Sequence, residues 1–548
     1  MQKEKMKQQK EKVKNTNNQA GISQFDENGK RKSKSTILIE IGCKFELFHD
    51  AIGAGYVTIT GKNHKETWPI RSRKFAELLA DKYFALIGRG VSKNTISDAM
   101  DTLCGKARVH GKSHSIYRRI ASANGNIYND LGDDKWQSVE ITPNGWKIVG
   151  NPPVKFLRNA SSLSLPTPQR GGTLDDLWKL INVREEDRAL IAGFLIRALC
   201  PEPPYFGLCV AGEQGTGKST FCTMIRSFSD PSTAMLRPPP KDDRDFLAGA
   251  VNNWCLTYDN LSGIQPWLSD SFCRVLTGGS FAGRTLYSTT EETTVPLARP
   301  VVLNGIDDIA TRPDLADRVI AIELQPIKDS NRLEERHLWE NFNKLKGRIF
   351  GVLLDGLSSA LKNVDSINLE YRPRQLDATK WASAAEAGLG FASGSFVTAY
   401  QRNQKELVSI SLESSPFIAA LVDLLKEKQR WEGTSSDLLI LLPDYARDED
   451  AVKSRAWPKS PAWGGRTLKR HAPALRKVGM DIEFSKNESG RLITLYFNTM
   501  QDKAETTKSA QSTVFTVHTG QDRFEHDSKN GKDSKKRENS EEKITVSV

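Results

Sequence analysis

The sequence predicts an α/β protein, and three observations support this fold class. From Pro204 to about residue 325, short apolar runs alternate with helix-like segments, as in an open α/β sheet. The first run, Phe206–Val210, is continuously apolar, which favours a strand buried on both faces. A glycine-rich segment joins this run to the next helical segment. We therefore expect a central domain built around a largely parallel sheet.

Composition divides the rest of the chain. Two tails are polar and poor in large apolar side chains, so they should not form a core. Between them, changes in strand and helix pattern mark four further segments. The expected segments are a disordered basic tail (1–36), an α+β accessory domain of unknown role (37–160), the α/β core (174–328), a helical region (329–412), a winged-helix-like domain (413–498) and a disordered tail (499–548).

Charge and cysteine usage limit the class of protein. The formal net charge is +11, which favours a polyanionic partner such as nucleic acid, although a basic solvated surface is the alternative. No run of 18 apolar residues occurs, so we expect no membrane association. The 7 cysteines form no CxxC pair, which favours reduced thiols in the cytoplasm over disulfides or a zinc site.

The glycine-rich segment fits the pattern G-x-x-x-x-G-K-[ST]. Its glycines let backbone N–H groups turn inward around phosphate oxygens. Lys218 supplies a charge to the outer phosphates and Ser219 a hydroxyl to Mg²⁺. The pattern predicts an enzyme that binds and hydrolyses ATP with Mg²⁺. The residues expected to contact the nucleotide are Gly212, Glu213, Gln214, Gly215, Thr216, Gly217, Lys218, Ser219 and Thr220.

A phosphate loop of this kind needs a carboxylate on a neighbouring strand to hold the metal. Asp259 ends an apolar strand some forty residues downstream, and we assign it this role. The next residue is Asn260 rather than a second acid, so no general base is obvious. Glu213 and Asp245 remain alternatives for that base.

Three further polar residues follow in an informative order. Asn304 ends the strand 300–303, where it can orient the attacking water. Arg312 and Arg318 lie in the segment Thr311–Arg318, and an arginine at a subunit edge can reach a neighbour's γ-phosphate. We treat Lys218, Asp259, Asn304 and Arg318 as the catalytic set.

The order of these motifs resembles superfamily 3 helicases and their poxvirus-type relatives, which are AAA+ ATPases of phages, plasmids, integrative elements and DNA viruses. The resemblance extends over roughly 175–410 and includes Leu276–Gly279 and Asp314–Arg318. It implies an AAA+ core with a helical lid. It also implies that Asn304 is sensor 1 and that Arg318 is the arginine finger, with Arg312 as its competitor. Members of this group typically form hexameric rings that pump single-stranded DNA.

The same resemblance places a DNA-contacting hairpin at Gly283–Leu297, just before sensor 1. Its tip, Ser288–Glu292, is acidic here, which departs from the usual Lys or His. Arg284 and Arg299, nearer the hairpin base, are the substitutes.

A winged helix is expected near the C-terminus. The segment Thr467–Gly479 has apolar positions at helical spacing, and two β-segments follow it. Pro473 should kink or restart this helix. The helix can enter a major groove, and a solvated basic helix is the alternative. The basic side chains on its other faces are Arg466, Lys469, Arg470, Arg476 and Lys477.

These features predict a DNA helicase or translocase that acts in replication of a phage, plasmid or integrative element as a ring, and the resemblance implies that this ring is a homo-hexamer. Its expected partners are single-stranded or forked DNA and host replication proteins. An AAA+ initiator or helicase loader that binds origin DNA is the alternative. A helicase–primase would need a polymerising site in 37–160, where no acidic pair suits one.

Overall fold

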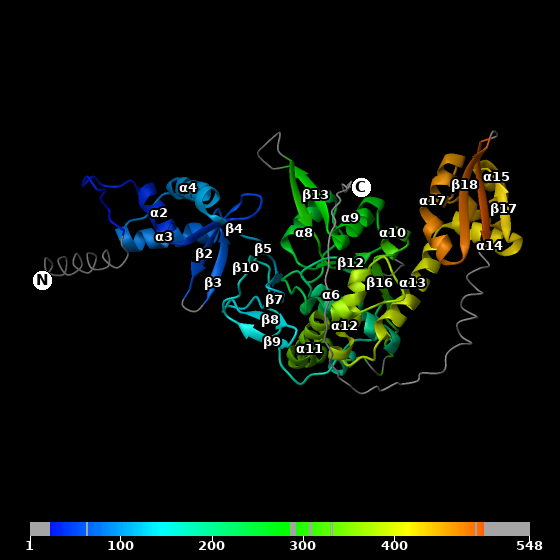
Figure 1. Ribbon diagram of the computed structural model, residues 1–548, viewed down its shortest axis with the longest axis horizontal. Coiled ribbons are helices and arrows are strands. Elements are labelled where there is room, and N and C mark those ends of the chain that lie inside the picture. The colour runs from blue at the N-terminus through cyan, green and yellow to red at the C-terminus, as the bar shows by residue number, and fades with distance from the viewer. Residues whose placement is uncertain are drawn as a thin grey trace, which may run out of the picture. The chain divides into compact units, whose positions relative to one another are not determined.

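The computed structural model describes residues 22–61, 64–284, 292–305, 310–328, 330, 332–487 and 490–497. Their buried apolar side chains form three main cores: one from Ile22 to Ala107, one from Ile120 to Leu407 and one from Val408 to Leu495. We refer to the corresponding parts as the N-terminal, central and C-terminal domains (Figure 1). The expected tail 499–548 lies outside the described residues.

The N-terminal domain packs three helices with a four-stranded sheet. The helices are α2 (Lys34–Gly42), α3 (Arg73–Ile87) and α4 (Lys93–His110). The sheet has the order β3-β2-β1-β4, with β1 (Glu46–His49), β2 (Gly55–Thr60), β3 (Lys65–Pro69) and β4 (Lys112–Ser113).

The prediction that residues 1–36 form a disordered tail is wrong for the last part of this segment. Ile22 is buried in the N-terminal core, and the Ser33 side chain caps α2 by accepting from Thr36 N. Residues 1–21 lie outside the described residues. The low apolar content of this stretch concealed a single anchoring isoleucine.

A second, antiparallel sheet belongs to the central domain rather than to an accessory domain. Its order is β6-β7-β8-β9, with β6 (Ile120–Ala123), β7 (Asn126–Asp130), β8 (Ser138–Thr142) and β9 (Gly145–Val149). Ile127, Ile141 and Trp146 join the central core, and Trp146 Nε1 donates to Asp355 Oδ1 at 2.9 Å. The expected unit 37–160 therefore divides between two cores. Strand β5 (Ile116–Tyr117), just before β6, pairs with β10 (Lys155–Phe156).

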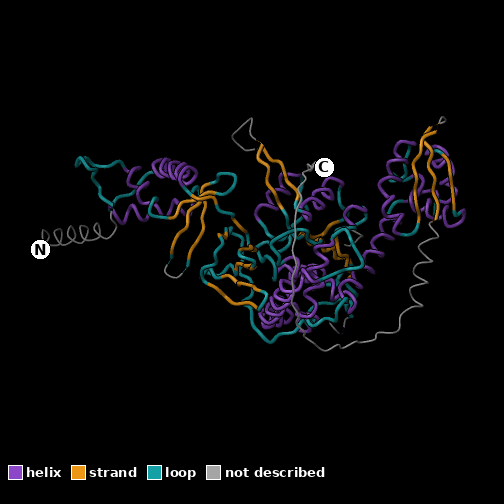
Figure 2. Tube along the Cα trace, viewed as in Figure 1, coloured by secondary structure: helices purple, strands orange, loops and turns teal. Residues whose placement is uncertain are grey.

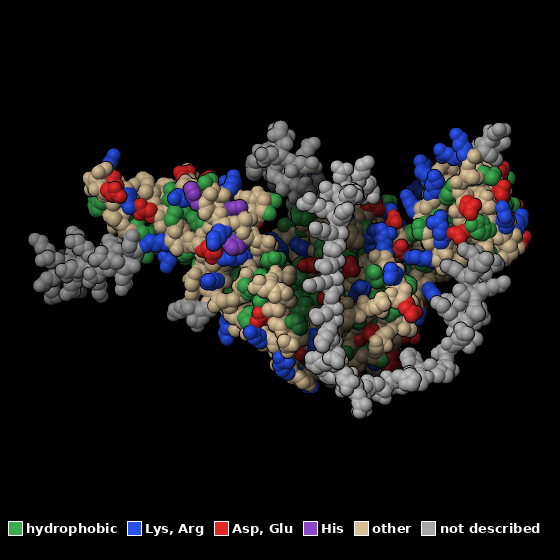
Figure 3. All heavy atoms as spheres, in the orientation of Figure 1, with side chains coloured by type: hydrophobic (Ala, Val, Ile, Leu, Met, Phe, Trp, Pro, Cys, Tyr) green, Lys and Arg blue, Asp and Glu red, His purple; other side chains and the backbone are tan. Residues whose placement is uncertain are grey.

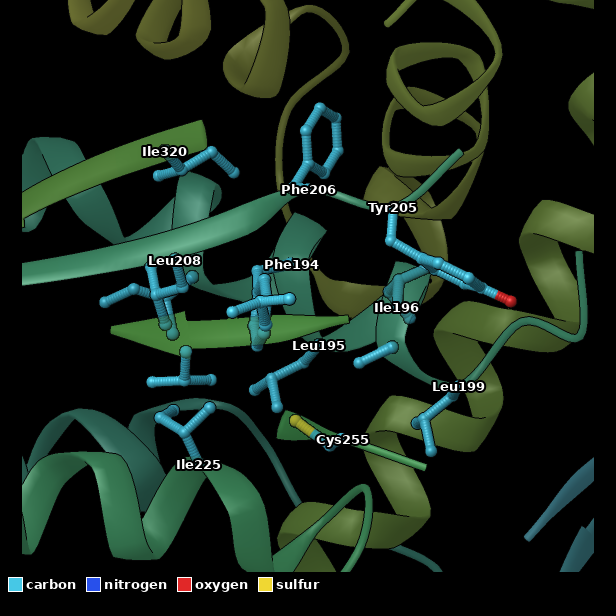
Figure 4. Close-up of a cluster of buried hydrophobic side chains, with 14 of the residues drawn as sticks. Phe194, Leu195, Ile196, Leu199, Tyr205, Phe206, Leu208, Ile225, Cys255 and Ile320 are labelled. Atoms are coloured by element: carbon cyan, nitrogen blue, oxygen red, sulfur yellow. The ribbon is translucent and has the colours of Figure 1, made fainter. Parts of the chain in front are cut away.

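The central sheet is wholly parallel, which confirms the α/β class. Its strands are β11 (Gly207–Ala211), β12 (Leu256–Leu261), β15 (Val301–Gly305) and β16 (Val319–Glu323), in the order β12-β15-β11-β16. Leu208 on β11 lies among buried side chains from the neighbouring helices and strands, including Phe194, Ile225 and Ile320 (Figure 4). This burial on both faces explains the continuous apolar run.

Helices surround the central sheet. In α6, every residue from Ala189 to Ala198 is buried. A hairpin of β13 (Gly279–Arg284) and β14 (Glu292–Leu297) projects from the domain (Figure 1). The helices of this domain are α5 (Asp175–Trp178), α6 (Arg188–Ala198), α7 (Lys218–Ser227), α8 (Asp243–Asn252), α9 (Pro266–Thr277), α10 (Pro313–Ala316), α11 (Glu335–Asn363), α12 (Leu376–Leu389) and α13 (Ser395–Glu413).

The C-terminal domain sets helices beside a three-stranded antiparallel sheet (Figure 2). Its helices are α14 (Pro416–Lys428), α15 (Ser435–Leu441), α16 (Glu449–Lys453) and α17 (Pro461–Lys477). The strands β17 (Arg430–Gly433), β18 (Met480–Asn487) and β19 (Gly490–Phe497) have the order β17-β19-β18. The expected kink or break at Pro473 does not end the helix, since α17 runs through it.

No single helix in the described part of the chain is long and apolar enough to cross a membrane. Helices α13 and α14 would be long and apolar enough only if they were taken together, and the chain bends by 104° between them. All seven cysteines are free thiols, and only Cys43 is exposed.

Candidate functional site

The segment Gly212–Gly217 forms a loop between β11 and α7. Gly212, Gly215 and Gly217 have φ values of 145°, 85° and 84°, a region that L side chains rarely adopt. A Cβ atom at Gly212 would lie 2.9 Å from the Leu324 carbonyl oxygen. Glycine is thus required both for the turn and for the close approach of the chain after β16. The resulting backbone suits the cradle that phosphate oxygens need.

Lys218 and Thr216 hold this loop closed. Lys218 Nζ donates to the carbonyl oxygens of Gly212 at 2.7 Å and Glu213 at 2.8 Å. The buried Thr216 hydroxyl donates to the same Glu213 oxygen at 2.9 Å. The ammonium therefore lies across the loop, where incoming phosphate oxygens can compete for it.

Ser219, Asp259 and Asn304 meet beside the loop. The sheet explains why: β15 lies between β11 and β12, and all three strands end at the same edge. Ser219 Oγ lies 3.3 Å from both Asp259 carboxylate oxygens. Asn304 Nδ2 donates to Ser219 Oγ at 3.3 Å and also to Asp259 Oδ1. The structure thus brings together residues that are 85 positions apart.

The oxygen atoms of this group fit Mg²⁺. A hydroxyl and a carboxylate are hard ligands, and Mg²⁺ is usually held by one or two such groups together with phosphates and waters. In the described part of the chain, no cluster of three or more His, Cys, Asp or Glu side chains could form an all-protein metal site. Ser219 and Asp259 are therefore the residues that would hold the ion.

A cavity of about 640 Å³ opens on the other side of the loop. Its walls combine apolar side chains, among them Ile181, Ile327 and Leu338, with polar and charged ones, and Arg332 lies at Gly215. Such a cavity can hold the base and sugar of a nucleotide whose phosphates occupy the loop. One wall comes from the predicted loop itself, through Gly215, Thr216, Gly217 and Thr220. The other walls come from separate segments that carry no motif, so they could not be predicted from the sequence.

Arg318 lies at the opposite edge of the sheet, whereas Arg312 donates to the Pro266 carbonyl oxygen at the start of α9. The Arg318 carbonyl oxygen accepts from Gly207 N at 3.0 Å, at the start of β11, whereas the phosphate loop follows its end. Five residues of strand span roughly 15 Å. Arg318 Nη1 donates to the Asp314 carbonyl oxygen, and Arg312 Nη2 pairs with Asp270 at 2.9 Å. Neither guanidinium contacts the phosphate loop of its own chain.

The alternatives for the general base do not join the group. Asp245 Oδ2 accepts from Lys241 N at 3.2 Å at the start of α8. Glu213 is exposed. No hydrogen bond connects either side chain with Ser219, Asp259 or Asn304 in the part of the chain that the structure covers.

Of the two basic residues expected to contact DNA near the hairpin base, the structure describes the side chain of Arg299. Most of the hairpin's acidic tip, and the Arg284 side chain, lie outside the described residues. Arg299 cannot serve as the substitute. Its guanidinium donates to the carbonyl oxygens of Ala250, Asn253 and Ala298 and stacks 5.3 Å from the centre of the Trp254 ring. Burial lowers the pKa of Arg299 to about 10.

Basic side chains gather on the C-terminal domain on the side of α17 (Figure 3). Arg466, Lys469 and Arg470 are exposed. Among the described residues, none of these three pairs with a carboxylate. Lys469 lies 5.1 Å from the centre of the partly exposed Phe484 ring on β18. The other two basic residues predicted on this helix form ion pairs: Arg476 with Asp481 at 3.2 Å, and Lys477 with Asp317 at 2.5 Å.

Comparison with known families identifies the chain. Residues 174–391 match the family described as actinomycete integrative conjugative element replication protein. Residues 417–512 match the model for the C-terminal domain of the same replication protein, RepA. Together the two matches span more than half of the chain. The chain belongs to this family of replication proteins.

Other comparisons of this replication protein add little. No curated protein matches it. One solved structure, "The A form apo structure of NrS-1 C terminal region-CTR", is 11% identical with a TM-score of 0.39, over 84% of this chain and 98% of that one. Another, "The apo structure of NrS-1 C terminal region (305-718)", is 11% identical with a TM-score of 0.38, over 85% and 100%.

Each of the two family matches contains a different group of the candidate site residues of this replication protein. The first includes the phosphate loop, Asp259, Asn304 and both arginines, and the second includes α17 and its following hairpin. The N-terminal domain and the sheet β6-β7-β8-β9 lie outside both. The expected role in replication of a mobile element is confirmed at this level.

Proposed function

We propose that this replication protein is an ATP-dependent DNA helicase or translocase with an AAA+ core. The observation that carries the proposal is the meeting of Ser219, Asp259 and Asn304 beside the phosphate loop. A parallel sheet in which the Asn304 strand separates the strands of the loop and of Asp259 is also typical of ATPases of this class.

Each residue has a defined task in hydrolysis. The loop N–H groups and Lys218 bind and orient the β- and γ-phosphates. Ser219 and Asp259 hold Mg²⁺, which neutralises charge on the phosphates when bound. Asn304 orients water through its carboxamide. The cavity beside the loop holds the adenosine, so that the phosphate chain enters from one side.

A ring accounts for the position of the arginines. Arg318 lies at the edge of the sheet opposite its own phosphate loop, so it can act only on a nucleotide bound by another subunit. We therefore assign Arg318 as a finger supplied in trans, with Arg312 as its competitor, in a homo-hexamer.

The C-terminal domain supplies duplex DNA binding. Its element order of helix, strand, three further helices and a hairpin, with β19 between β17 and β18, resembles that of a winged helix. Arg466, Lys469 and Arg470 on α17 would contact phosphates beside the groove. Single-stranded or forked DNA, together with host replication proteins in the cytoplasm, completes the proposed partners.

An AAA+ initiator or loader is the second candidate. The burial of Arg299 favours it, because a translocating hairpin needs cations to grip a strand. Such a protein would bind origin DNA and recruit the host machinery without processive unwinding.

The test measures ATP hydrolysis and displacement of a labelled strand from a forked duplex, with Mg²⁺. The wild type should hydrolyse ATP faster with DNA and displace the strand, whereas Lys218→Ala should do neither. Lys106→Ala, on the exposed face of α4, is the matched control and should behave as the wild type. Hydrolysis without displacement, together with Lys218→Ala protecting a specific origin site in a footprint, would favour the loader. Absence of hydrolysis by the wild type would refute both.

A further inference from the structure

Strand β12 carries one extra residue beside Asn304. Tyr258 pairs with Leu303 and Leu261 with Gly305, so β12 advances three residues while β15 advances two. Asp259 and Asn260 therefore both lie opposite Asn304. This is a β-bulge, an arrangement that re-aims a side chain and is over-represented beside active sites.

Asn260 is the residue whose backbone departs from the regular strand conformation at this bulge. Asp259 N donates to the Arg237 carbonyl oxygen at 2.8 Å, which holds Asp259 in a regular extended position. Asn260 has a φ of 56°, in the left-handed region that asparagine tolerates better than most residues. The bulge breaks the alternation of side chains along the strand, which otherwise points consecutive residues to opposite faces.

Two carboxamides at this bulge, those of Asn260 and Asn304, are left with unused hydrogen-bonding capacity. Asn304 is 1% exposed, and its Nδ2 is committed to Ser219 and Asp259, while its buried Oδ1 has no partner in the described structure. The Asn260 side chain is exposed and likewise makes no hydrogen bond to another described residue. A buried acceptor without a partner indicates a missing donor, such as water.

We propose that Asn260 is a positioning residue that, together with Asn304, holds the water which attacks the γ-phosphorus. This inference rests on the proposed ATPase function. It accounts for an amide at a place where a carboxylate base would otherwise be expected, because an amide oxygen can accept a hydrogen bond from water without taking its proton.

The chemistry is then complete without a carboxylate base. The water oxygen forms a bond to the γ-phosphorus, and the bond from that phosphorus to the bridging oxygen of ADP breaks. The proton of the water passes to a non-bridging oxygen of the transferred phosphate. Phosphoryl transfer of this kind depends mainly on positioning and on charge stabilisation, so two amides that fix the water suffice.

A purely structural role for Asn260 makes a different prediction. If only the left-handed backbone mattered, glycine would serve as well, because it adopts positive φ at no steric cost. Asn260→Gly therefore removes the side chain and keeps the turn. Asn260→Asp keeps both the turn and an acceptor oxygen.

The experiment measures kcat for ATP hydrolysis and, separately, the Kd for ATP in the full chain. Asn260→Gly should lower kcat about 10- to 100-fold, since misplaced reactants lose this much, and leave the Kd within about twofold. Asn260→Asp should recover kcat to within about fivefold of the wild type. Asn124→Gly is the matched control, because Asn124 is also exposed with a φ of 53° but lies in the β6–β7 turn.

Three results would overturn the inference: an unchanged kcat in Asn260→Gly, a parallel loss of kcat and ATP binding, or no recovery in Asn260→Asp. An inactive wild type would instead refute the ATPase function itself. The two failures are therefore distinguishable.

Discussion

Asp230 connects the β6-β7-β8-β9 sheet with the strands of the proposed ATP site, and its removal should destabilise the central domain. Its carboxylate accepts from Trp254 N at 2.7 Å and Cys255 N at 3.2 Å, just before β12 begins. It also pairs with Arg119 Nε at 3.2 Å and lies 3.9 Å from Arg226 Nη2. Arg226 is fully buried and Arg119 is 5% exposed.

The change Asp230→Ala would leave these two buried cations without their carboxylate. Removing one partner of a buried pair costs about 3–5 kcal/mol of unfolding free energy. Arg119 and Arg226 retain bonds to carbonyl oxygens, which places the expected loss near the lower figure. For a domain of about 300 residues, each kcal/mol lowers Tm by roughly 1.5–2 °C, so the central transition should fall by at least about 5 °C.

Differential scanning calorimetry provides the measurement, with the central transition identified by its shift on addition of Mg-ATP. Asp134→Ala is the control, because Asp134 is exposed in the loop between β7 and β8. A fall in Tm of less than about 2 °C, equal to that of the control, would show that the buried network contributes little.

Three further predictions concern the subunits, the DNA and the thiols. Arg318→Ala should reduce ATP hydrolysis at least about 10³-fold without weakening ATP binding, and mixing it with Lys218→Ala subunits should restore part of the activity; no restoration would contradict action in trans. The triple change of Arg466, Lys469 and Arg470 to alanine should lower the slope of log Kd for duplex DNA against log salt by about three, whereas an equal slope would exclude phosphate contacts. One thiol, that of Cys43, should react rapidly with a thiol reagent in the native protein, because burial raises the pKa of Cys200 to about 11 and of Cys209 to about 12 and so keeps them protonated; rapid reaction in Cys43→Ser would refute this.

The residues at the ends of the central strands could be predicted from the sequence. Parallel strands end at one edge, so the order of the loop, Asp259 and Asn304 was enough to predict that they would meet. The sequence leaves the general base open because Asn260 follows Asp259 where a second acid could stand. The bulge at this point could not be predicted, because one extra residue in a strand changes no pattern in the sequence.

Features that depend on packing could not be predicted. Arg299 follows a hairpin strand and looks like any exposed arginine, yet three carbonyl oxygens and Trp254 bury it. Pro473 leaves the Lys469 carbonyl without an intrahelical donor, but Pro473 lies on the exposed face of α17, where water can replace that bond.

The packing of strands β6 to β9 against the central domain also determines which fragments of the chain can be expressed as folded proteins. A fragment that begins at residue 174, as the family match does, would lose Ile127, Ile141 and Trp146 from the central core and expose the apolar surface of α11 and its neighbours. Such a fragment should aggregate on expression. A fragment that begins near Ile116 and ends near Glu413 keeps the core whole, and it is the smallest piece in which the isolated central domain can be expected to fold.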